Sequence, residues 1–408
     1  MTDKPVVSVI IPTLRAGEDL LECLESIASD ADAPSNEVVV VFNSPKPYDL
    51  DLTKHHSGAR AVETDKNLGF AGGCNLGALN AIGGKLVFLN DDMRVKPGWL
   101  ASLTEPIGQD NGVVATGGRI LMSDEKTIDF DGSSINLLGW GFQKGHGESA
   151  RSIDDEFRES VRLPFACGGN FAIDPDVFES AGKFDETYFA YYEDVDLGWR
   201  LRLMGHEIEY VPDAVTFHNS GETGKLLAPQ TKWFLQERNA LMTIIKSLSD
   251  DILRKVLPIA FSLVSVRAQI LSSLDETDIF PDEFWRDLIL GESMKEKSEG
   301  HGGLLKGIVD GVKLSIKSGM KHARKSGLPE GYLPIESRGA AGLFAVEWCL
   351  NNWDELMSKR AKVQGMRKVD DGMLLSIFDD LTRPVLGHPR EIDAMKPLEE
   401  IVDGMLGG

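Results

Sequence analysis

Four short apolar runs near the start of the chain constrain its fold more than any other feature of the sequence. They are VVSVIIP at 6–12, EVVVVF at 37–42, RAVET at 60–64 and KLVFLNDD at 85–92. Continuous β-branched runs of this kind are typical of strands buried on both faces of a parallel sheet. A helical apolar spacing at 20–27 and a glycine-rich stretch at 67–84 separate them. The pattern predicts an α/β fold with an open, mainly parallel sheet and helices on both faces.

The rest of the chain changes character twice. From 113 to 218 short strand-like runs alternate with loops, and from 225 onwards the sequence is mostly helical. The apolar run VLPIAFSLVSV at 256–266 contains Pro258 and is too short to span a bilayer. The chain opens directly into a strand-like segment and not into a signal peptide. We therefore expect a protein that is not integral to a membrane.

The charge balance and the cysteines limit the class of partner and the compartment. The chain has 64 acidic and 43 basic residues, a formal net charge of −21. Nucleic-acid-binding proteins present a basic face, so this balance argues against nucleic acid as a partner. The four cysteines lie far apart and fit no metal or redox spacing. This predicts reduced core thiols in a cytoplasmic protein.

Two common phosphate-binding motifs fail on inspection. A P-loop would need glycine six residues before Lys85, where the sequence has Leu79, and Ser or Thr after it, where it has Leu86. A dinucleotide fingerprint that starts at Gly72 would need a glycine in the place of Cys74. The sequence therefore excludes a P-loop NTPase and a nicotinamide-dependent enzyme.

Acidic residues gather where predicted elements begin or end. Asp91 and Asp92 end the fourth apolar run. Glu193 and Asp194 begin a later helix, and His218 closes the strand AVTFH. Ligands of open α/β sheets bind beyond the carboxyl ends of the strands, and carboxylate and imidazole groups suit Mg²⁺ or Mn²⁺. If these groups converge, an anionic substrate would need a cation beside it, as a nucleotide diphosphate does.

At this point the segments resemble a known family. They are similar to the family 2 inverting glycosyltransferases of GT-A fold, in particular the rhamnosyltransferase and galactofuranosyltransferase branch. The matching segments follow the family's order over residues 6–245: VSVIIPT, EVVVVFN, NLGFAGGCNLG, FLNDDM, GGNFAIDPDVFESAGKFDE, YYEDVDLGWRLRLMG, VPDAVTFH and ERNALMTIIKS. Each segment is weak alone, and it is their common order that makes the resemblance specific.

The resemblance implies an organisation and a reaction. It implies a GT-A catalytic domain at 1–224, with a nucleotide-sugar part at 1–112 and an acceptor part at 113–224, before a mostly helical region at 225–408. It implies a divalent cation, Mg²⁺ or Mn²⁺, and a nucleotide-diphosphate sugar as donor, with rhamnose or galactofuranose as the sugar. The acceptor would be a hydroxyl of a glycan or of a polyprenyl-linked saccharide, in the assembly of cell-wall or surface polysaccharide.

The resemblance also carries roles to single residues. NDD at 90–92 resembles the family's metal-binding D-x-D variant, which implies Asp92 and Asp91 as metal ligands together with His218. Asp194 resembles the general base, with Glu193 beside it. The positions at which the family contacts the donor are Thr13, Asn43, Asn67, Gly69, Gly72 and Asp91. A carboxylate base activates the acceptor hydroxyl, and a metal acts as a Lewis acid on the leaving phosphates.

One residue departs from the family's pattern, and two other functions stay open. The second strand of the family ends in an aspartate that reads the nucleobase, and this chain has Phe42 there, so the base of the donor stays open. The alternative function is a catalytically silent GT-A scaffold that binds a nucleotide sugar or a partner enzyme. A nucleotidyltransferase is a weaker alternative, because PTLRAGED after the first strand offers only Arg15 for a triphosphate.

The helix that begins at the acids Glu193 and Asp194 also contains Asp196, which lies four residues before Arg200. We interpret Asp196 and Arg200 as a structural pair on the surface.

The segment at 304–327 suggests a role for the helical region. It combines an apolar stripe with six positive charges against one acid. One interpretation is an ordinary amphipathic helix on the domain core, and the other is a helix that docks on an anionic membrane surface. The remaining helices are candidates for a homo-oligomer interface. We expect a cytoplasmic protein, peripheral on the inner face of the plasma membrane in the second interpretation.

Overall fold

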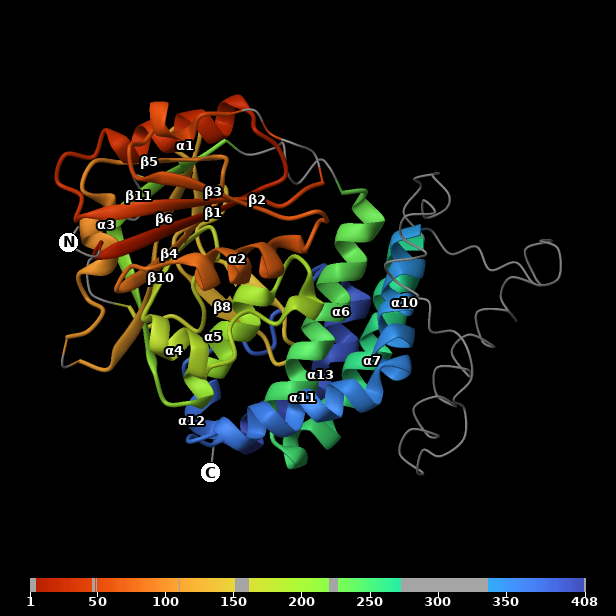
Figure 1. The fold of residues 1–408 in the computed structure, drawn as a ribbon. Helices are drawn as coiled ribbons and strands as arrows, with labels where there is room; N and C mark the ends of the chain where they lie inside the picture. Colours follow the sequence, from red (N-terminus) through yellow and green to blue (C-terminus); the bar gives the residue numbers. More distant parts are fainter. Residues whose placement is uncertain are drawn as a thin grey trace. The chain divides into compact units, whose positions relative to one another are not determined.

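The structure, a computed structural model, describes residues 5–45, 48, 50–109, 111–150, 161–219, 227–272 and 337–406. The chain divides into two compact units (Figure 1). Unit 1 contains Met1–Asn136, Gly141–Leu226 and Gly365–Asp380. Unit 2 contains Leu137–Trp140, Leu227–Gln364 and Leu381–Gly408. The segment 304–327 lies outside the described residues.

A nine-stranded mixed sheet forms the centre of unit 1. Its strand order is β3-β2-β1-β4-β10-β6-β11-β5, with β7 paired to β6. The strands are β1 (Val7–Thr13), β2 (Asn36–Phe42), β3 (Ala59–Glu63), β4 (Lys85–Leu89), β5 (Met93–Val95), β6 (Val113–Met122), β7 (Ile128–Phe130), β10 (Asn170–Ile173) and β11 (Glu207–His218). A separate two-stranded sheet joins β8 (Ser133–Ile135) to β9 (Gly141–Gln143).

The predicted α/β class is confirmed, and the four apolar runs are the strands β1 to β4. These strands pair in parallel, so their carboxyl ends meet at one edge of the sheet. β10 runs antiparallel between β4 and β6 and joins this parallel half to the rest of the sheet. β11 returns parallel to β6 and also pairs with β5. This last pairing carries the end of β11 back to the segment that follows β4.

The helices of unit 1 cover the sheet. They are α1 (Glu18–Ala28), α2 (Gly69–Asn80), α3 (Trp99–Thr104), α4 (Pro175–Ser180), α5 (Glu193–Leu203) and α12 (Asp371–Leu375), with short 3₁₀ turns η1 (Leu52–Lys54) and η3 (Glu186–Tyr188). In α1 Leu20, Leu24 and Ile27 are buried as their helical spacing predicts, together with Cys23, whereas Leu21 of the same stripe is half-buried. In α2 glycine allows close packing, because a Cβ on Gly77 would lie 2.3 Å from the Ile10 side chain.

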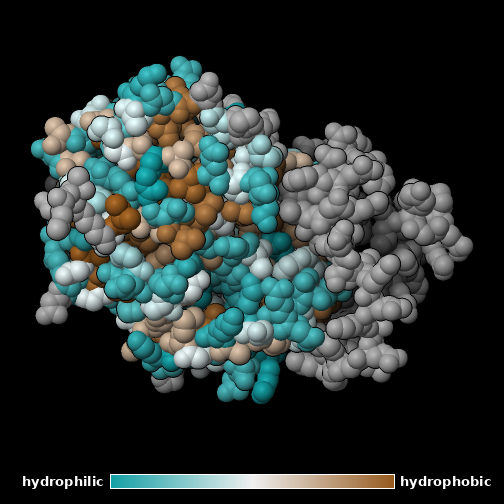
Figure 2. Space-filling model, viewed as in Figure 1, coloured by the Kyte–Doolittle hydropathy of each residue, from teal (hydrophilic) through white to brown (hydrophobic). Residues whose placement is uncertain are grey.

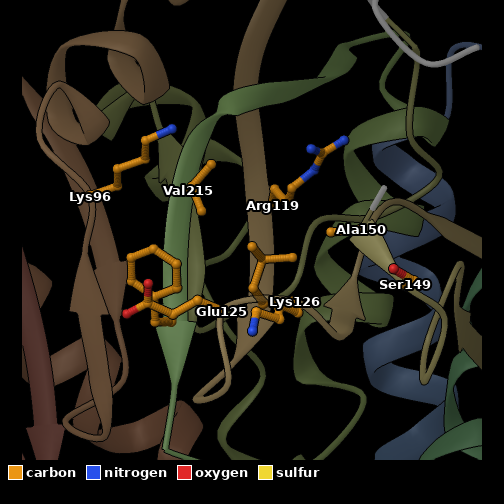
Figure 3. A pocket seen from close by; sticks show the side chains of 9 residues that line it. Lys96, Arg119, Glu125, Lys126, Ser149, Ala150 and Val215 are labelled. Atoms are coloured by element: carbon orange, nitrogen blue, oxygen red, sulfur yellow. The ribbon is translucent and has the colours of Figure 1, made fainter. Parts of the chain in front are cut away.

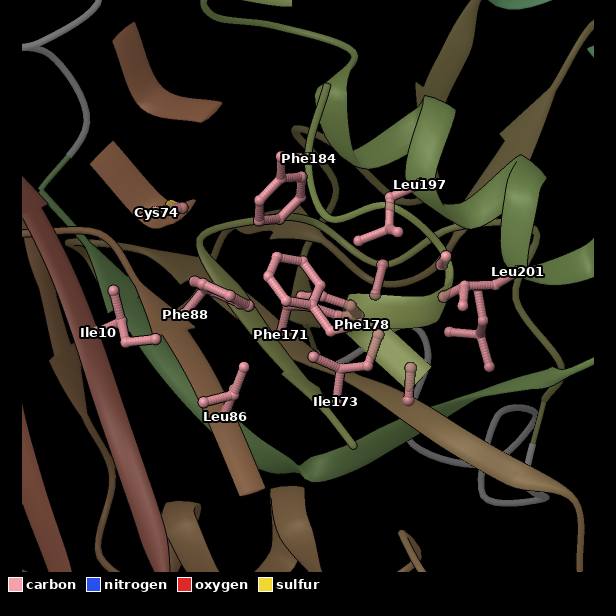
Figure 4. Packing of buried hydrophobic residues seen from close by; sticks show 14 of the residues in the cluster. Ile10, Cys74, Leu86, Phe88, Phe171, Ile173, Phe178, Phe184, Leu197 and Leu201 are labelled. Atoms are coloured by element: carbon pink, nitrogen blue, oxygen red, sulfur yellow. The ribbon is translucent and has the colours of Figure 1, made fainter. Parts of the chain in front are cut away.

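Aromatic rings fill the core between the sheet and the helices α4 and α5. Phe88 of β4 lies 5.2 Å from Phe178 and 5.2 Å from Phe184, and 5.9 Å from Phe171, between ring centroids. Figure 4 shows these rings facing Leu197 and Leu201 of α5. Most large apolar side chains of the unit are buried in this way. Figure 2 nevertheless shows apolar surface framed by polar groups on one face of the protein.

Unit 2 is helical, as predicted for the C-terminal region. Its helices are α6 (Pro229–Ser247), α7 (Asp250–Ser272), α10 (Ser337–Asn351), α11 (Trp353–Met366), which extends into the last segment of unit 1, and α13 (Pro389–Leu406). A buried charge cluster ties three of them together. Arg267 of α7 bonds both carboxylate oxygens of Glu237 on α6 and lies 3.4 Å from Glu391 on α13. All three side chains are almost fully buried, so the pairing of opposite charges is what makes their burial tolerable.

One helix of the described residues passes a length and composition test for crossing a membrane. It is α7, 23 residues long, with a mean hydropathy of 1.3 in its most apolar window. The apolar run judged too short in the sequence is therefore part of a longer helix. Of that window, 56% is buried inside the protein, and Arg267 on the same helix is paired with two carboxylates. Core helices of soluble proteins pass the same test, so this finding is weak evidence for a span.

Candidate functional site

The turn after β4 holds the two acids of NDD, and they face different neighbours. Asp91 lies near Thr13 and Arg15 at the end of β1. Burial, helped by the charge of Asp92, raises the pKa of Asp91 to about 7, although a hydrogen bond with Thr13 works in the opposite direction. Asp92 is 5% exposed and turns towards His218 instead. The two acids predicted as joint metal ligands therefore contact different neighbours, although each lies close enough to the other to affect its charge.

Asp92 and His218 come together because of strand pairing. His218 is opposite Met93 in the β11–β5 ladder, one residue after Asp92. Its Nε2 lies 3.3 Å from Asp92 Oδ2. The other oxygen, Asp92 Oδ1, is buried and has no hydrogen-bond partner among the residues that the structure describes. A buried carboxylate oxygen without a partner is unfavourable, and a bound cation would satisfy it.

The opposite nitrogen of His218 contacts an acid that the sequence analysis did not single out. Nδ1 lies 2.6 Å from Asp129 Oδ2 in β7. The second oxygen of Asp129 lies 3.1 Å from Nδ1 of His146. Burial favours the neutral ring, but the hydrogen bonds and charges of Asp129 and Asp92 outweigh it and raise the pKa of His218 to about 10. A metal bound at Nε2 would therefore displace a proton from this ring.

The acids of the ED pair open α5. Asp194 accepts hydrogen bonds from the backbone N–H of Gly168 at 3.0 Å and of Val195 at 2.8 Å. Burial raises the pKa of Asp194, and these backbone hydrogen bonds oppose the shift. Glu193 is 5% exposed, and its Oε2 lacks a hydrogen-bond partner within the described part of the chain. Burial and the neighbouring charges of Asp194 and Asp196 raise the pKa of Glu193 well above its usual range.

A glycine turn before β10 joins the two motifs. The N–H of Gly168 donates to Asp194, while the carbonyl of Gly169 accepts from the N–H of Asn90 at 3.3 Å. Consecutive α-carbons lie about 3.8 Å apart, so one peptide unit separates the contact to the base candidate from the contact to the NDD turn. The turn has no room for a side chain, because a Cβ on Gly169 would lie 2.9 Å from the Asn90 side chain.

Asn170, the first residue of β10, holds the glycine turn in place through hydrogen bonds of its side chain. The residue is fully buried. Its side-chain amide donates to the carbonyls of Arg119 and Ala214 at 3.1 and 3.2 Å, and its oxygen accepts from the indole of Trp99 at 2.8 Å. These contacts tie β10 to β6, β11 and α3, and they explain why the turn holds a fixed position.

The segment before Asp194 has an unusual backbone. Phe189, Tyr191 and Tyr192 have φ values of 64°, 65° and 67°. Bulky residues rarely adopt this left-handed conformation, and such strain is concentrated at functional sites. The segment meets the glycine-rich stretch directly, because the carbonyl of Phe189 accepts from the N–H of Ala71 at 3.3 Å. Gly69 has φ 72° and a Cβ there would lie 2.2 Å from that carbonyl.

The residues predicted to contact the nucleotide lie at the carboxyl edge of the parallel strands, where they already bond one another. Asn43 follows β2 and accepts from the N–H of Leu68 at 2.8 Å, while its amide donates to the carbonyl of Gly69 at 2.7 Å. The side-chain oxygen of Asn67 accepts from the N–H of Gly69 at 2.8 Å. The asparagines thus hold the entrance of α2 against the sheet.

The two remaining donor candidates are also close-packed. Thr13 is buried, and its hydroxyl donates to the carbonyl of Arg15 at 2.6 Å. Gly72 lies in α2, where a Cβ would meet the side chain of Leu68 at 2.7 Å. Both positions shape the edge of the sheet on which a donor would rest.

Phe42 is not open to a nucleobase. It is 2% exposed, and the ring of Tyr48 is stacked on it with 4.2 Å between centroids and an interplanar angle of 21°. The hydroxyl of Tyr48 donates to the carbonyl of Leu14 at 2.7 Å. The half-buried Tyr48 therefore covers the place where the family has its base-reading acid.

The interpretation of Asp196 and Arg200 as a surface pair is wrong, because both side chains are buried. Arg200 Nε lies 2.9 Å from Asp196 Oδ2, and Tyr188 donates to Asp196 Oδ1 at 3.1 Å. Arg200 also donates to the carbonyl of Lys183 at 2.8 Å. The buried pair therefore joins α5 to the segment that precedes it. The spacing of the two residues in the sequence could not reveal this role.

A cavity of about 680 Å³ lies elsewhere in unit 1 (Figure 3). Its lining includes Lys96, Arg119, Lys126, Val215 and Phe217. Val215 and Phe217 alternate with His218 along β11, so the cavity is on the face of the strand opposite to His218. None of the predicted site residues lines it.

The protein groups fit a divalent cation held partly by its substrate. Within the described ranges no three His, Cys, Asp or Glu side chains form a complete metal cage. Mg²⁺ is commonly bound by one or two carboxylates together with substrate phosphates and water. Asp92, with its unpaired buried oxygen, provides one such carboxylate, and Nε2 of His218 provides a nitrogen ligand next to it.

A comparison with known protein families shows to which family the residues around this site belong. The model described as "Glycosyl transferase family 2" matches residues 8–182, a range that contains the NDD turn and the glycine turn. Residues 8–182 belong to glycosyl transferase family 2. The family 2 match thus covers the parallel half of the sheet and β10, and it agrees with the family expected from the resemblance.

Curated relatives match longer stretches of the chain. The chain is 28% identical over 243 residues to the O-antigen biosynthesis protein RfbC of Myxococcus xanthus, covering 57% of this chain and 19% of that protein. It is 25% identical over 245 residues to the N-acetylglucosaminyl-diphospho-decaprenol L-rhamnosyltransferase of Mycobacterium tuberculosis. This match covers 55% of this chain and 79% of that protein. A crystal structure of GalNAc-T7 with UDP, GalNAc and Mn²⁺ superposes with a TM-score of 0.48 at 16% identity, covering 71% of this chain and 55% of that one.

Proposed function

We propose that this protein is a metal-dependent, inverting glycosyltransferase that moves a sugar from a nucleotide-diphosphate donor to a hydroxyl of a glycan or polyprenyl-linked saccharide. One observation carries the proposal. The N–H of Gly168 donates to the Asp194 carboxylate, and the carbonyl of the next residue, Gly169, accepts from the N–H of Asn90 in the NDD turn. A base and a leaving-group site thereby lie next to each other at the carboxyl edge of the sheet, where α/β folds bind their ligands.

Asp194 acts as the general base. It accepts the proton of the acceptor hydroxyl while the acceptor oxygen forms a bond to the anomeric carbon. The bond between that carbon and the diphosphate oxygen breaks, the nucleoside diphosphate leaves with the electron pair, and the configuration at the carbon inverts. The raised pKa of Asp194 suits a base, because its conjugate acid is then a weaker acid. Burial and the charge of Asp194 raise the pKa of the neighbouring Glu193 well above its usual range.

Asp92 and His218 hold the divalent cation, Mg²⁺ or Mn²⁺. When bound, such a cation stabilises the charge that develops on the leaving diphosphate. Asp91 lies beside Thr13 and Arg15, and we assign to it a contact with the donor next to the cation. The Mycobacterium tuberculosis relative supports rhamnose as the transferred sugar and a lipid-linked saccharide as acceptor. Galactofuranose is a second candidate from the resemblance alone. An enzyme with such an acceptor would act at the cytoplasmic face of the plasma membrane.

Calorimetry tests the donor site. UDP, dTDP and GDP are titrated with and without Mn²⁺ into the wild type, Asp92→Ala and the control Asp32→Ala, which changes an exposed acid in a loop. We expect one diphosphate to bind in a Mn²⁺-dependent manner to the wild type and the control, and not to Asp92→Ala. Binding that is equal in all three proteins would contradict the assignment of Asp92. Binding without turnover of any donor sugar would favour the silent scaffold.

A further inference from the structure

Asp129 stands out because it bonds the far side of the metal-ligand candidate His218. The contact between His218 Nδ1 and Asp129 Oδ2 is 2.6 Å, shorter than the 3.3 Å between Nε2 and Asp92. We propose that Asp129 is a positioning residue, which fixes the tautomer and orientation of His218 so that Nε2 is presented to the cation beside Asp92. This inference rests on the proposed function, because it assigns a supporting role in the same site.

The carboxylate of Asp129 is itself held on its other side. His146 contacts both the side-chain Oδ1 and the backbone carbonyl of Asp129 through Nδ1, each at 3.1 Å. The backbone around it is fixed by a ladder, in which Ile128 donates to Glu148 and Asp131 donates to Lys144. Asp129 is 8% exposed, whereas the side chain of His146 is 53% exposed. The result is a row of four groups, Asp92, His218, Asp129 and His146, that runs from the NDD turn to the surface.

The chemical reason lies in the two nitrogens of imidazole. A neutral histidine carries its proton on one nitrogen, and only the other has a lone pair for a metal. A carboxylate that accepts from Nδ1–H keeps the proton there and leaves Nε2 for the metal, and it makes the ring a stronger ligand. Asp129 meets this requirement in distance and burial. The simpler alternative is that Asp129 only balances the charge of a buried ring, and the two ideas differ in what happens to metal affinity.

The first readout is Mn²⁺ affinity, measured by calorimetry in the presence of the nucleoside diphosphate that binds best. We expect Asp129→Asn to weaken Mn²⁺ binding by about 10- to 100-fold, the usual effect of losing such a partner of a metal-bound histidine. Binding of the nucleotide without metal should stay unchanged. The control is Asp124→Asn, the same chemical change in the neighbouring turn, where the carboxylate only accepts from Lys126 and Thr127. It should bind Mn²⁺ like the wild type.

The second readout is the histidine tautomer itself, from long-range ¹H–¹⁵N spectra of ¹⁵N-histidine-labelled protein with Mg²⁺ and nucleotide. The chain has eight histidines, and His218→Gln identifies the signals of His218 by their loss. We expect the proton on Nδ1 in the wild type and a mixture, or the proton on Nε2, in Asp129→Asn. If Asp129→Asn does not fold, His146→Ala decides, since its ring is half exposed, and it should weaken Mn²⁺ binding by a few-fold.

The outcomes separate this inference from the proposed function. A wild type that binds no diphosphate with Mn²⁺ would overturn both. A wild type that binds, with Asp129→Asn unchanged in affinity and tautomer, would overturn the positioning role alone. A loss of affinity in Asp129→Asn with the tautomer unchanged would also overturn it, in favour of charge balance.

Discussion

At the residue scale, Asp194 is defined by what surrounds it more than by its own chemistry. Two backbone N–H groups fix its carboxylate, burial raises its pKa, and Glu193 beside it is buried with an unpaired oxygen. A carboxylate in bulk water would be a weak base. In this setting it is oriented and partly desolvated, which is the combination that a general base requires.

Asp194→Asn removes the base with little change in shape, and it keeps one of the two oxygens that accept from the N–H groups of Gly168 and Val195. We expect kcat to fall by about 10²- to 10⁴-fold, because this is the usual contribution of general base catalysis. The nucleotide affinity should stay within about twofold. Steady-state kinetics and calorimetry on the same preparation check this. A variant with near-normal kcat would show that another group takes the proton.

The pH profile gives a second test of the same residue. A base works when deprotonated, and burial raises the pKa of Asp194, so kcat/KM should fall as the pH decreases through that raised pKa. The fall should therefore occur at a higher pH than for an ordinary aspartate. Glu193→Gln is the control, since Glu193 titrates in the same pair. If the acid limb disappears in Glu193→Gln, it belongs to Glu193 and the assignment of the base is wrong.

The sequence could point to Asp92, Asp194 and His218 because each lies at the end of a recognisable element within a family motif. It could not point to Asp129, because its partner His218 lies 89 residues away and the hairpin that positions it has no distinctive pattern. The different neighbours of Asp91 and Asp92 depend on the conformation of a turn, which the sequence of two adjacent acids does not reveal. Phe42 was recognised as a departure, but its cover by Tyr48 is a tertiary contact.

At the scale of elements, the site depends on the contact between α2 and the strained segment before α5. Phe189, Tyr191 and Tyr192 keep their left-handed backbone because the surroundings hold them, and Gly69 allows the closest approach. The long apolar strands β1, β2 and β4 were predictable from sequence. The three-residue strands β5, β7, β8 and β9 were not, because such short strands exist only through their partners.

Gly69→Ala should therefore damage both fold and function. A Cβ there would lie 2.2 Å from the Phe189 carbonyl on a residue with φ 72°, so the backbone has to move. We expect a loss of about 2 kcal/mol or more in unfolding free energy, as for overpacked sites. Urea unfolding measures it. Gly365→Ala is the control, exposed in α11 with nothing within 4 Å, and it should gain about 0.5–1 kcal/mol.

At the scale of the whole molecule, the chain returns to unit 1 after building most of unit 2. Residues Gly365–Asp380 belong to unit 1, and they contact the C-terminal half of α5, the helix that carries Asp194 in its first turn. Phe378 lies edge-on to Trp199, with 4.7 Å between ring centroids, and the N–H of Lys368 donates to the carbonyl of Leu203 at 2.7 Å. A boundary near 225 read from the sequence does not anticipate this late segment.

Phe378→Ala tests whether the late segment stabilises unit 1. The ring is 3% exposed, so its loss should cost about 3–5 kcal/mol in unfolding free energy. Urea unfolding followed by tryptophan fluorescence reports it through the neighbouring Trp199. Phe344→Ala, at a ring that is 39% exposed in unit 2, should cost much less. Equal losses in the two variants would contradict a specific role for Phe378.

The glycine turn at 168–169 has a consequence for how enzymes with this arrangement can diversify. Because one peptide unit separates the contact to the base from the contact to the NDD turn, the spacing of the two chemical partners is set by covalent geometry. In the proposed function, sugar, nucleobase and acceptor would also be contacted by other parts of the protein, which can vary without altering that spacing. We expect variants selected for new donors or acceptors to keep the same stereochemical outcome, so that product identity changes while the configuration of the new bond does not.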